Sequence, residues 1–542
     1  MKYDYIIIGS GFGGSVAALR LTQKGYKVAV IEAGKRWRTE DFTFKNWNLR
    51  KFLFLPKIGC YGIQRLNFLK DVFIISGAGV GGGSLVYANT LYVPGDDFFS
   101  SPSAQQLGGK EKLLPFYELA KSMLGVTQNP LITEQDKLMK AVATDMGKGD
   151  TFQTTPVGVY FGKAGEEADD PFFEGEGPAR KGCTHCGKCM TGCDKNAKNT
   201  LDKNYLYFAE KLGAEVIPEH TVVDVLTTED QGYRIKARKT TGSGQLEISC
   251  KGVIYAAGAL GTNNLLLKLR TKGSLPDLPD GIGDFVRTNS ESIITVKSNS
   301  KTVDYTKGVA ITSSVHPDDQ THIEPVRYGM GDDLMGAFVG MSTTGDGLVP
   351  RWLKATWKAI THPIDFLNLF NPFDWARTSF VLLVMQTVDN HINLRRKRRW
   401  IWPFSKSITS EYGSDKRNPT WIPKGLEFAK NLAKRTNGTV YSVRTENLMN
   451  APLTAHIMGG CSIKNEVIDE QNRLKGYPNM WVVDGAQIPE NLGVNPSLSI
   501  TALAERAMSM IPTKDGCEFQ HLKVEAKWGI RSLVSPDQLV QK

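Results

Sequence analysis

The segment 5–32 constrains the fold of this chain more than any other stretch of its 542 residues. It opens with a short apolar run, residues 5–8, of the kind that forms a parallel strand buried on both faces. Gly9, Gly11 and Gly14 follow in the G-x-G-x-x-G spacing. Glycines so spaced permit a tight turn, a close approach of backbone to a pyrophosphate, and close packing of a helix on a strand. The helix after the turn would point its N–H groups and the positive end of its dipole at the phosphates.

A second apolar run, residues 28–31, ends at Glu32, whose carboxylate can accept hydrogen bonds from an adenosine ribose. A glycine triplet alone would be equally compatible with a flexible loop. Here strand, triplet, helix, strand and acid occur in order, which is specific to a dinucleotide site. The sequence therefore predicts an α/β, Rossmann-like unit at the start of a chain that is α+β overall.

Length and composition are typical of a globular protein with two or more domains. Hydrophobic residues make up 41% of the chain and charged residues 23%. No uncharged run approaches the roughly 18–20 residues that a membrane-spanning helix needs. Because the dinucleotide motif begins at Tyr5, we expect no signal peptide and a cytoplasmic location, with any membrane contact peripheral and on the inner face.

Much of the net charge of +10 is local. A basic run, residues 395–399, directly precedes an aromatic stretch, residues 400–404. A solvated hairpin tip explains such a cluster as well as a binding surface does. Basic residues beside tryptophans suit an anionic bilayer better than a nucleic-acid groove, and no nucleic-acid-binding signature accompanies them. We therefore predict no nucleic-acid partner and keep a peripheral membrane contact open.

Three later segments are predicted to line a nucleotide site. Residues 76–84 are rich in glycine, and structured apolar sequence resumes directly after them, so we expect backbone passing close to a flat or phosphorylated group. Residues 252–261 are typical of a buried strand that runs into a glycine turn and a helix. Residues 480–508 fit a strand, a turn and a helix.

The middle of the chain changes pattern. Residues 103–145 are expected to be largely helical, whereas residues 290–440 alternate in the manner of a mostly antiparallel sheet. Within the latter, the aromatic and leucine-rich segment 352–375 fits either a core helix pair or a partly exposed amphipathic lid. We favour the core.

Four of the eight cysteines, Cys183, Cys186, Cys189 and Cys193, form a C-x2-C-x2-C-x3-C run. This is the bacterial ferredoxin spacing without the proline that usually follows the last cysteine. In a cytoplasmic chain the spacing favours a metal over disulfides. A [4Fe–4S] cluster, a zinc site and reduced structural thiols all stay open.

Several motifs together resemble those of the glucose–methanol–choline (GMC) flavoprotein oxidoreductases. They are the glycine triplet from Gly9, the glycine segment 76–84, His456 in AHIMGGC and Asn495 in DGAQIPENLGVNPSLSITALAERA. Within this family, the segments LRKFLFLPKIGCYGIQR, GAGVGGGSLVYANTLYVP, THIEPVRYG and NPTWIP are similar to those of bacterial cholesterol oxidases, particularly the mycobacterial ones. The resemblance covers nearly the whole chain.

The resemblance implies two domains and a surface tail at residues 513–542. The FAD-binding domain would be assembled from residues 1–100, 194–288 and 474–512. The substrate domain, whose sheet covers the flavin, would comprise residues 101–193 and 289–473. The residues expected to hold FAD are Gly9, Gly11, Gly14, Glu32, Gly79, Gly82, Gly83, Ser84, Asn89, Val222, Gly258, Asp484, Gly485, Asn495 and Pro496.

Oxidation of an alcohol requires removal of the hydroxyl proton while hydride leaves the carbon for the flavin. A side chain with a pKa near neutral suits the proton transfer, and the resemblance selects His456, with Asn495 as its partner at the substrate oxygen. Glu324 is the candidate base for moving a steroid double bond, because an apolar cavity would raise its pKa. The alternative for Glu324 is an ion pair with Arg327.

The resemblance thus implies FAD-dependent oxidation of a sterol-like secondary alcohol, with or without isomerisation of a double bond. Molecular oxygen would be the simplest electron acceptor unless an iron–sulfur cluster hands electrons to a carrier. Two alternatives stay open. One is a dehydrogenase of another lipophilic alcohol that serves a membrane acceptor, and the other is a membrane-associated lipid-binding flavoprotein without turnover.

Overall fold

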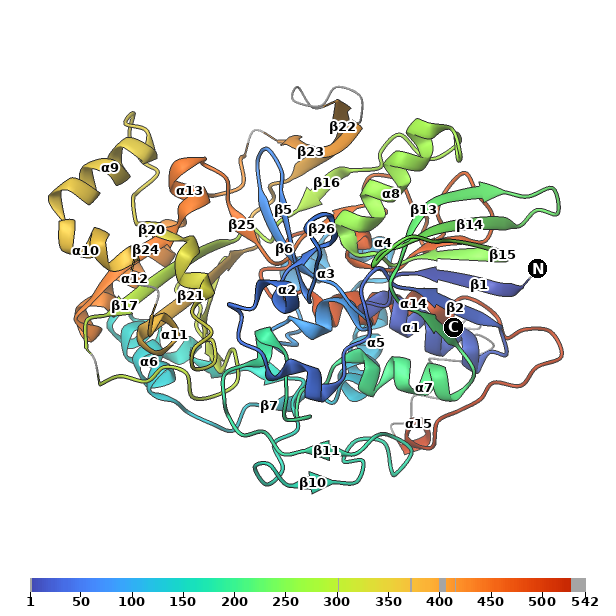
Figure 1. Ribbon diagram of the computed structural model, residues 1–542, viewed down its shortest axis with the longest axis horizontal. Helices are drawn as coiled ribbons and strands as arrows, with labels where there is room; N and C mark the ends of the chain where they lie inside the picture. The colour runs from blue at the N-terminus through green and yellow to red at the C-terminus, as the bar shows by residue number, and fades with distance from the viewer. Residues whose placement is uncertain (1, 301, 371–372, 399–405, 415, 528–542) are drawn as a thin grey trace.

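The computed structural model describes residues 2–300, 302–370, 373–398, 406–414 and 416–527. Two large sheets lie toward opposite ends of the long axis of the molecule, and helices cover both (Figure 1). The predicted combination of a Rossmann-like unit with an antiparallel sheet is confirmed.

The first sheet contains the predicted N-terminal motif. Its strands are β1 (Tyr3–Ile8), β2 (Val28–Ile31), β12 (Glu215–Ile217), β13 (His220–Thr227), β14 (Tyr233–Lys239), β15 (Gln245–Tyr255) and β27 (Met480–Val482). They follow the order β12-β2-β1-β15-β14-β13, and β27 pairs with β15. Strands β12, β2, β1, β15 and β27 run parallel where they pair, while β13 and β14 form an antiparallel extension. The centre of the parallel part is apolar, at residues 5–8, 28–31 and 253–255, because helices cover both of its faces.

One face of this sheet packs against α1 (Phe12–Gln23), α5 (Gly109–Leu124), α7 (Tyr205–Lys211) and α14 (Ser497–Ser509), which share a single hydrophobic cluster. Helix α14 contacts both α1 and α5 and lies between them. The other face packs against α8 (Gly258–Lys272). Helix α1 is buried along its whole length, and its buried cation, Arg20, pairs with the carboxylates of Glu505 and Glu525.

The second sheet consists of β19 (Thr321–Val326), β21 (Ser379–Gln386), β17 (Ser292–Ser298), β24 (Gly438–Val443) and β20 (Val339–Met341), in that order and antiparallel throughout. Helices α6 (Glu134–Asp145) and α12 (Pro423–Thr436) pack on one face. The opposite face carries a separate apolar cluster that includes α11 (Trp375–Thr378).

Two smaller sheets lie between the large ones (Figure 1). One has the order β23 (Lys406–Tyr412), β22 (Ile392–Arg398), β16 (Asp284–Arg287) and β26 (Met458–Gly460). The other has the order β25 (Leu453–Thr454), β6 (Phe73–Gly77) and β5 (Gln64–Phe68). The short remaining elements are α2 (Leu49–Phe52), α3 (Asp96–Ser100), α4 (Pro102–Gln106), α9 (Arg351–Thr361), α10 (Pro363–Leu367), α13 (Arg444–Leu448), α15 (Lys523–Lys527), β3 (Phe54–Leu55), β4 (Cys60–Tyr61), β7 (Thr127–Gln128), β8 (Gln153–Thr154), β9 (Pro156–Val157), β10 (Glu167–Ala168), β11 (Arg180–Lys181) and β18 (Ser313–Ser314).

The structure corrects the preferred interpretation of residues 352–375. Helices α9 and α10 lie on the surface rather than in the core, and the described residues of the segment that are buried are Ala355, Leu369 and Trp375. The indole of Trp357 is 68% exposed. The segment is therefore the alternative that we had favoured less, a partly exposed amphipathic element.

Several other predictions have definite outcomes. Leu113, Leu119 and Met123 on α5 are buried as expected, whereas Leu114 is only partly buried. The basic run forms the end of β22, which pairs with β23 in a hairpin. Residues 399–405, between these two strands, lie outside the described residues, as do residues 528–542 of the tail. No helix in the described part of the chain is long and apolar enough to cross a membrane. The proposed domain boundaries stay a prediction, although α5, from the segment 101–193, packs with α1 and α14.

Candidate active site

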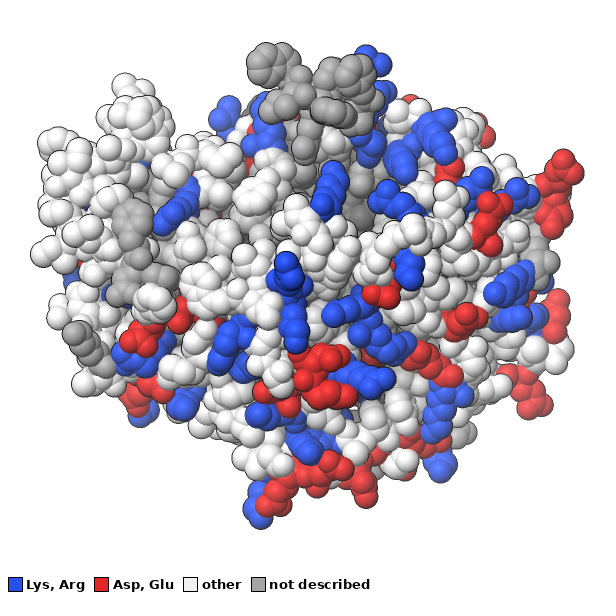
Figure 2. All heavy atoms as spheres, viewed as in Figure 1, with Lys and Arg blue, Asp and Glu red and all other residues white. Residues whose placement is uncertain are grey.

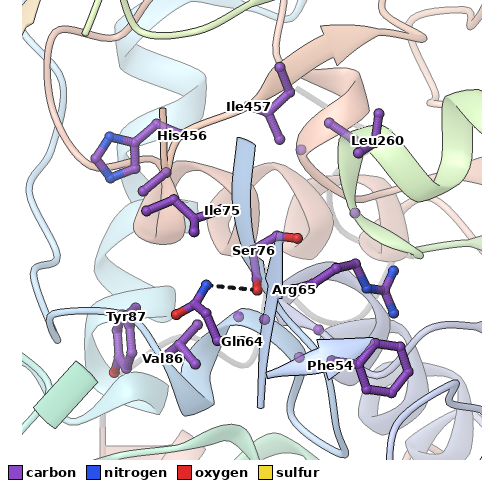
Figure 3. Close-up of a pocket in the computed structure, with 18 of the residues that line it drawn as sticks. Phe54, Gln64, Arg65, Ile75, Ser76, Val86, Tyr87, Leu260, His456 and Ile457 are labelled. Carbon is purple, nitrogen blue, oxygen red and sulfur yellow. Dashed lines mark hydrogen bonds between the residues drawn. The ribbon is translucent and has the colours of Figure 1, made fainter. Parts of the chain in front are cut away.

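A single cavity of about 710 Å³ extends from the glycine turn after β1 to the second sheet. Figure 3 shows Arg65 and His456 on opposite sides of it. The predicted site residues that line it are Gly9, Gly11, Glu32, Gly82, Gly83, Val222, Gly258, His456, Asp484, Gly485, Asn495 and Pro496. Residues predicted to bind the cofactor and residues predicted to act on the substrate therefore line the same cavity, although they are far apart in sequence.

The glycine turn fits a pyrophosphate. A Cβ atom on Gly11 would meet no heavy atom within 4 Å, so this position faces open space. Gly9 has a φ of +101°, and a Cβ atom on Gly14 would lie 2.0 Å from the carbonyl oxygen of Gly9. Helix α1 begins directly after this turn, and no side chain caps its first N–H groups. Gly9 and Gly14 thus serve the fold, while Gly11 leaves a phosphate room at the helix N-terminus.

The carboxylate of Glu32 is fixed at the cavity wall by hydrogen bonds. Its Oε2 accepts from the hydroxyl of Ser10 at 2.9 Å and from the backbone N–H of Ser10 at 3.1 Å. Its Oε1 accepts from the backbone N–H of Gly34 at 2.9 Å. Oε1 also accepts a long hydrogen bond from the backbone N–H of Gly79 at 3.4 Å, so both oxygens of this cavity-lining carboxylate are held in place.

Two polar side chains near the cavity, Asn89 fully buried and Arg65 partly buried, have atoms with no hydrogen-bond partner among the described residues. Asn89 is fully buried with a φ of +70°, and neither its amide oxygen nor its amide nitrogen has a hydrogen-bond partner there. The guanidinium of Arg65 lines the cavity over the ring of Phe54, and its Nε is likewise unpartnered. Unsatisfied buried groups are costly, so Arg65, which lines the cavity, fits a polar group brought in by a cofactor. Sequence reasoning missed Arg65, since no motif marks it.

Four predicted cofactor residues, Gly14, Gly79, Ser84 and Asn89, do not line the cavity but lie behind its wall. The hydroxyl of Ser84 donates to the carbonyl of Gly81 at 2.7 Å and accepts from a backbone N–H at 3.1 Å. The N–H of Gly79 points at Glu32 Oε1, 3.4 Å away. Ser84 and Gly79 therefore stabilise the conformation of the glycine segment.

The far wall is made by the start of α8 and by the loop after β27. Gly258, the first residue of α8, has a φ of +76°. Asp484 lies in the loop after β27, and its carboxylate faces the first turn of α8. The hydroxyl of Thr262 and the N–H of Ala486 donate to this carboxylate, but burial still raises the pKa of Asp484 to about 6.

His456, Asn495 and Glu324 form one hydrogen-bonded group. The amide nitrogen of Asn495 donates to Oε2 of Glu324 at 3.2 Å and lies 3.4 Å from Nε2 of His456. Because a carboxylate only accepts, the amide must present its NH2 group to Glu324, and the same NH2 group then faces Nε2. This arrangement favours the tautomer in which Nε2 is the unprotonated, basic nitrogen of the ring.

Glu291 completes this group and was missed by the sequence reasoning. It is fully buried, and its Oε2 lies 3.3 Å from Nδ1 of His456. The same oxygen accepts from the hydroxyl of Thr454 at 2.8 Å and from the N–H of Ala455 at 3.2 Å. The only sequence signal was an acidic residue placed directly before a buried strand, β17.

The carboxylates set the ionisation of the histidine. Burial disfavours the charged imidazole, but the charge and hydrogen bond of Glu291, and more weakly the charge of Glu324, outweigh it. The pKa of His456 is therefore raised above its ordinary value. Asn495 and His456 both border the cavity, so a substrate hydroxyl in the cavity can reach Nε2.

The alternative pairing of Glu324 with Arg327 does not form. The guanidinium of Arg327 instead donates to the carbonyl of Lys307 and to the hydroxyl of Thr312. Glu324 is fully buried, and its Oε1 lies 3.4 Å from Nε2 of His322. Glu324 therefore belongs to the group around Asn495.

Beyond this group the cavity wall becomes apolar. The lining there comes from the second sheet, from α11 and from the segment before β20, through Ile293, Val326, Leu334, Met335, Phe338, Val339, Trp375, Val381 and Leu383. An apolar chamber next to a histidine, an amide and carboxylates suits a hydrophobic molecule that carries one polar group.

The cysteine run does not form a metal site among the described residues, where no cluster of three or more His, Cys, Asp or Glu is arranged to hold an ion. All four thiols are free, and burial raises the pKa of Cys183 to about 12 and that of Cys189 to about 11. The run instead supports the cavity wall. The buried Nζ of Lys198 donates to the carbonyl oxygens of Cys189, Leu85 and Tyr87.

The sequence profile of the GMC oxidoreductases matches this chain in two parts, residues 3–269 and residues 389–504. The chain is 46% identical to a cholesterol oxidase of Acinetobacter baumannii, over 96% of both proteins. It is 47% identical to a cholesterol oxidase of Mycobacterium tuberculosis, over 94% of this chain and 91% of that one.

Solved structures share the fold at low sequence identity. Pyridoxine 4-oxidase from Mesorbium loti superposes with a TM-score of 0.62 at 13% identity, over 93% of this chain and 98% of the other. An FAD-dependent oxidoreductase from Chaetomium thermophilum superposes with a TM-score of 0.56 at 15% identity, over the same shares of the two chains.

Proposed function

Since this chain belongs to the GMC oxidoreductases, FAD-dependent enzymes that act on alcohols, we propose that it oxidises a sterol-like secondary alcohol to the ketone. The observation that carries the proposal is the cavity, in which a histidine and an amide border an apolar chamber. The similarity to two cholesterol oxidases over most of the chain supports a sterol as the substrate.

FAD, when bound, supplies the acceptor for the hydride. We propose that the turn around Gly11 and the N-terminus of α1 hold its pyrophosphate, and that Glu32 holds its ribose. The guanidinium of Arg65, which lines the cavity, is a further group available to it.

The reaction removes one proton and one hydride from the carbinol. We propose that Nε2 of His456 takes the hydroxyl proton while the amide of Asn495 orients the hydroxyl oxygen. Glu291, on the other side of the ring, stabilises the imidazolium that forms and keeps Nδ1 protonated. Hydride then leaves the carbon, whose bond to oxygen becomes the carbonyl.

Glu324 is the proposed base for a subsequent double-bond shift. It is buried, it is not neutralised by Arg327, and Asn495 links it to the carbinol end of the cavity. Glu324 lies behind Asn495 and does not line the cavity, and we propose that a carboxylate this near the substrate takes a proton from one steroid carbon and returns it to another.

We propose molecular oxygen as the electron acceptor, which yields hydrogen peroxide. The names of the two bacterial relatives, both oxidases, support this choice. The lack of a metal-holding cluster in the described part of the chain gives no support to electron transfer through the cysteine run. Oxygen consumption measured against reduction of an artificial dye separates an oxidase from a dehydrogenase.

Anaerobic bleaching of the bound flavin by cholesterol tests the whole assignment. We expect His456→Ala to slow bleaching by about 10²- to 10⁴-fold, the usual contribution of a general base, and Asn495→Ala to slow it as well. His521→Ala, near the C-terminal end of the described chain, is the matched control and should bleach at the wild-type rate. Undiminished bleaching in both site variants would refute the assignment.

A further inference from the structure

Helices α9 and α10 form the most concentrated apolar surface of the described chain. Figure 2 shows this corner of the molecule, at the upper left, with few charged side chains. The large apolar residues exposed between positions 348 and 373 are Leu348, Val349, Trp352, Leu353, Trp357, Ile360, Ile364, Phe366, Leu367 and Phe373. So much contiguous apolar exposure is unusual for a protein surface that meets only water.

The charged side chains of these helices turn away from the solvent. The guanidinium of Arg351 is buried, and the ammonium groups of Lys354 and Lys358 donate to backbone carbonyls in the loop 342–346. The carboxylate of Asp365 accepts from a threonine hydroxyl on β24 at 2.9 Å. A helix adapted to water has the opposite arrangement, with its charges outward, so the outer face of α9 and α10 is built for an apolar medium.

The inner face of α9 covers the apolar end of the cavity. Ala355 packs in the same cluster as Val339, Trp375, Val381 and Leu383, and the last four residues line the cavity. Helix α9 is thus a thin cover with the substrate chamber on one side and exposed tryptophan, isoleucine and leucine on the other. A hydrophobic substrate that crosses this cover would pass from one apolar face to another.

We propose that α9 and α10 dock into the surface of an anionic phospholipid bilayer and receive the substrate from it. The inference rests on the proposed function, because a sterol-like molecule resides in lipid. Tryptophan side chains such as Trp352 and Trp357 favour the interface between lipid and water. The end of β22 lies along the same upper edge of the molecule (Figure 1), and its exposed Arg398 offers a cation to anionic headgroups, whereas Arg396 and Lys397 already bind Asn264 and Glu411.

Vesicle sedimentation tests the docking. We expect the full chain, loaded with FAD, to bind vesicles of phosphatidylcholine mixed with phosphatidylserine more tightly than vesicles of phosphatidylcholine alone. The double variant Trp357→Glu, Ile360→Glu should bind at least about tenfold more weakly, since charges are expelled from the lipid interface. Ile58→Glu is the matched control, because Ile58 is 72% exposed but lies outside these helices.

Enzyme assays complete the test. The double variant should oxidise sterol embedded in vesicles at least about tenfold more slowly and a water-soluble steroid at the wild-type rate, because the fold and the cavity are intact. Vesicle binding by the double variant at the wild-type level would overturn the proposal. So would a wild-type dimer in solution that the double variant converts to monomer, since the surface would then join two copies of this chain. Vesicle binding without turnover of any steroid would support the docking and overturn the proposed substrate.

Discussion

Glu291→Gln isolates the electrostatic contribution of Glu291 to the reaction. In the wild type, Oε2 of Glu291 lies 3.3 Å from Nδ1 of His456 and also accepts from Thr454 and Ala455. Since these neighbours are donors, the glutamine must place its carbonyl oxygen there, and an acceptor stays 3.3 Å from Nδ1. The substitution therefore removes the negative charge and keeps the tautomer.

The magnitude follows from the separation. Two unit charges 3.3 Å apart interact by about 5 kcal/mol at an effective dielectric constant of ~20, and burial of the imidazolium opposes this. We expect the pKa of His456 to fall by about 1–3 units, the range seen when a charged neighbour is lost. Flavin reduction should slow by up to about tenfold for each unit of basicity lost.

Stopped-flow reduction of the flavin under anaerobic conditions, followed as a function of pH, provides the assay. The histidine accepts a proton only when neutral, so the wild-type rate rises as the pH passes through its raised pKa. In Glu291→Gln the pH range over which the rate rises should move to lower pH, and the rate at its plateau should be lower. Glu427→Gln, an exposed carboxylate on α12, serves as the control. A pH range and a plateau rate that both stay at their wild-type values would refute the role of Glu291.

Three further predictions concern the fold and its charges. Gly11→Val should fold with the wild-type melting temperature of the apoprotein but lose its flavin, whereas Gly14→Val should lower that melting temperature, since only at Gly14 would a Cβ atom collide with backbone. Burial raises the pKa of Glu446 to about 8, so the stability that it contributes is complete below its ordinary pKa and is lost as the pH rises to 8. Between pH 5 and pH 8, the free energy of unfolding should therefore fall less for Glu446→Gln than for the wild type, by up to about 1.4 kcal/mol per pH unit. Urea unfolding at the two pH values measures this difference. Arg20→Met, which leaves the buried carboxylates of Glu505 and Glu525 without their partner, should cost about 3–5 kcal/mol in urea unfolding, and a loss below 1 kcal/mol would contradict this account.

The sequence predicted the glycine turn and the antiparallel sheet because both depend on local pattern. The spacing of Gly9, Gly11 and Gly14 and the alternation after position 290 reflect contacts that every such strand and turn must make. Glu291 was missed because its partner, His456, lies 165 positions further along the chain, and no periodicity links the two.

Helices α9 and α10 show a different limit. An amphipathic pattern states that a helix has two unlike faces, and it was natural to place the apolar face inward. The sequence could not reveal that Lys354 and Lys358 find carbonyl acceptors on the protein side. The cysteine spacing left a metal site and reduced thiols open, because it specifies intervals along the chain but not the geometry of the loop, and the described residues hold no metal-binding group.

The position of β27 and α14 has a consequence for how this protein is made. Strand β27 adds to β15 in the N-terminal sheet, and α14 fills the space between α1 and α5. Until the ribosome has released roughly the last tenth of the chain, helix α1 keeps an apolar side uncovered, and the groove lacks the wall that carries Asp484 and Asn495. The cofactor cavity is therefore complete only once β27 and α14 have been synthesised and have packed against the N-terminal sheet.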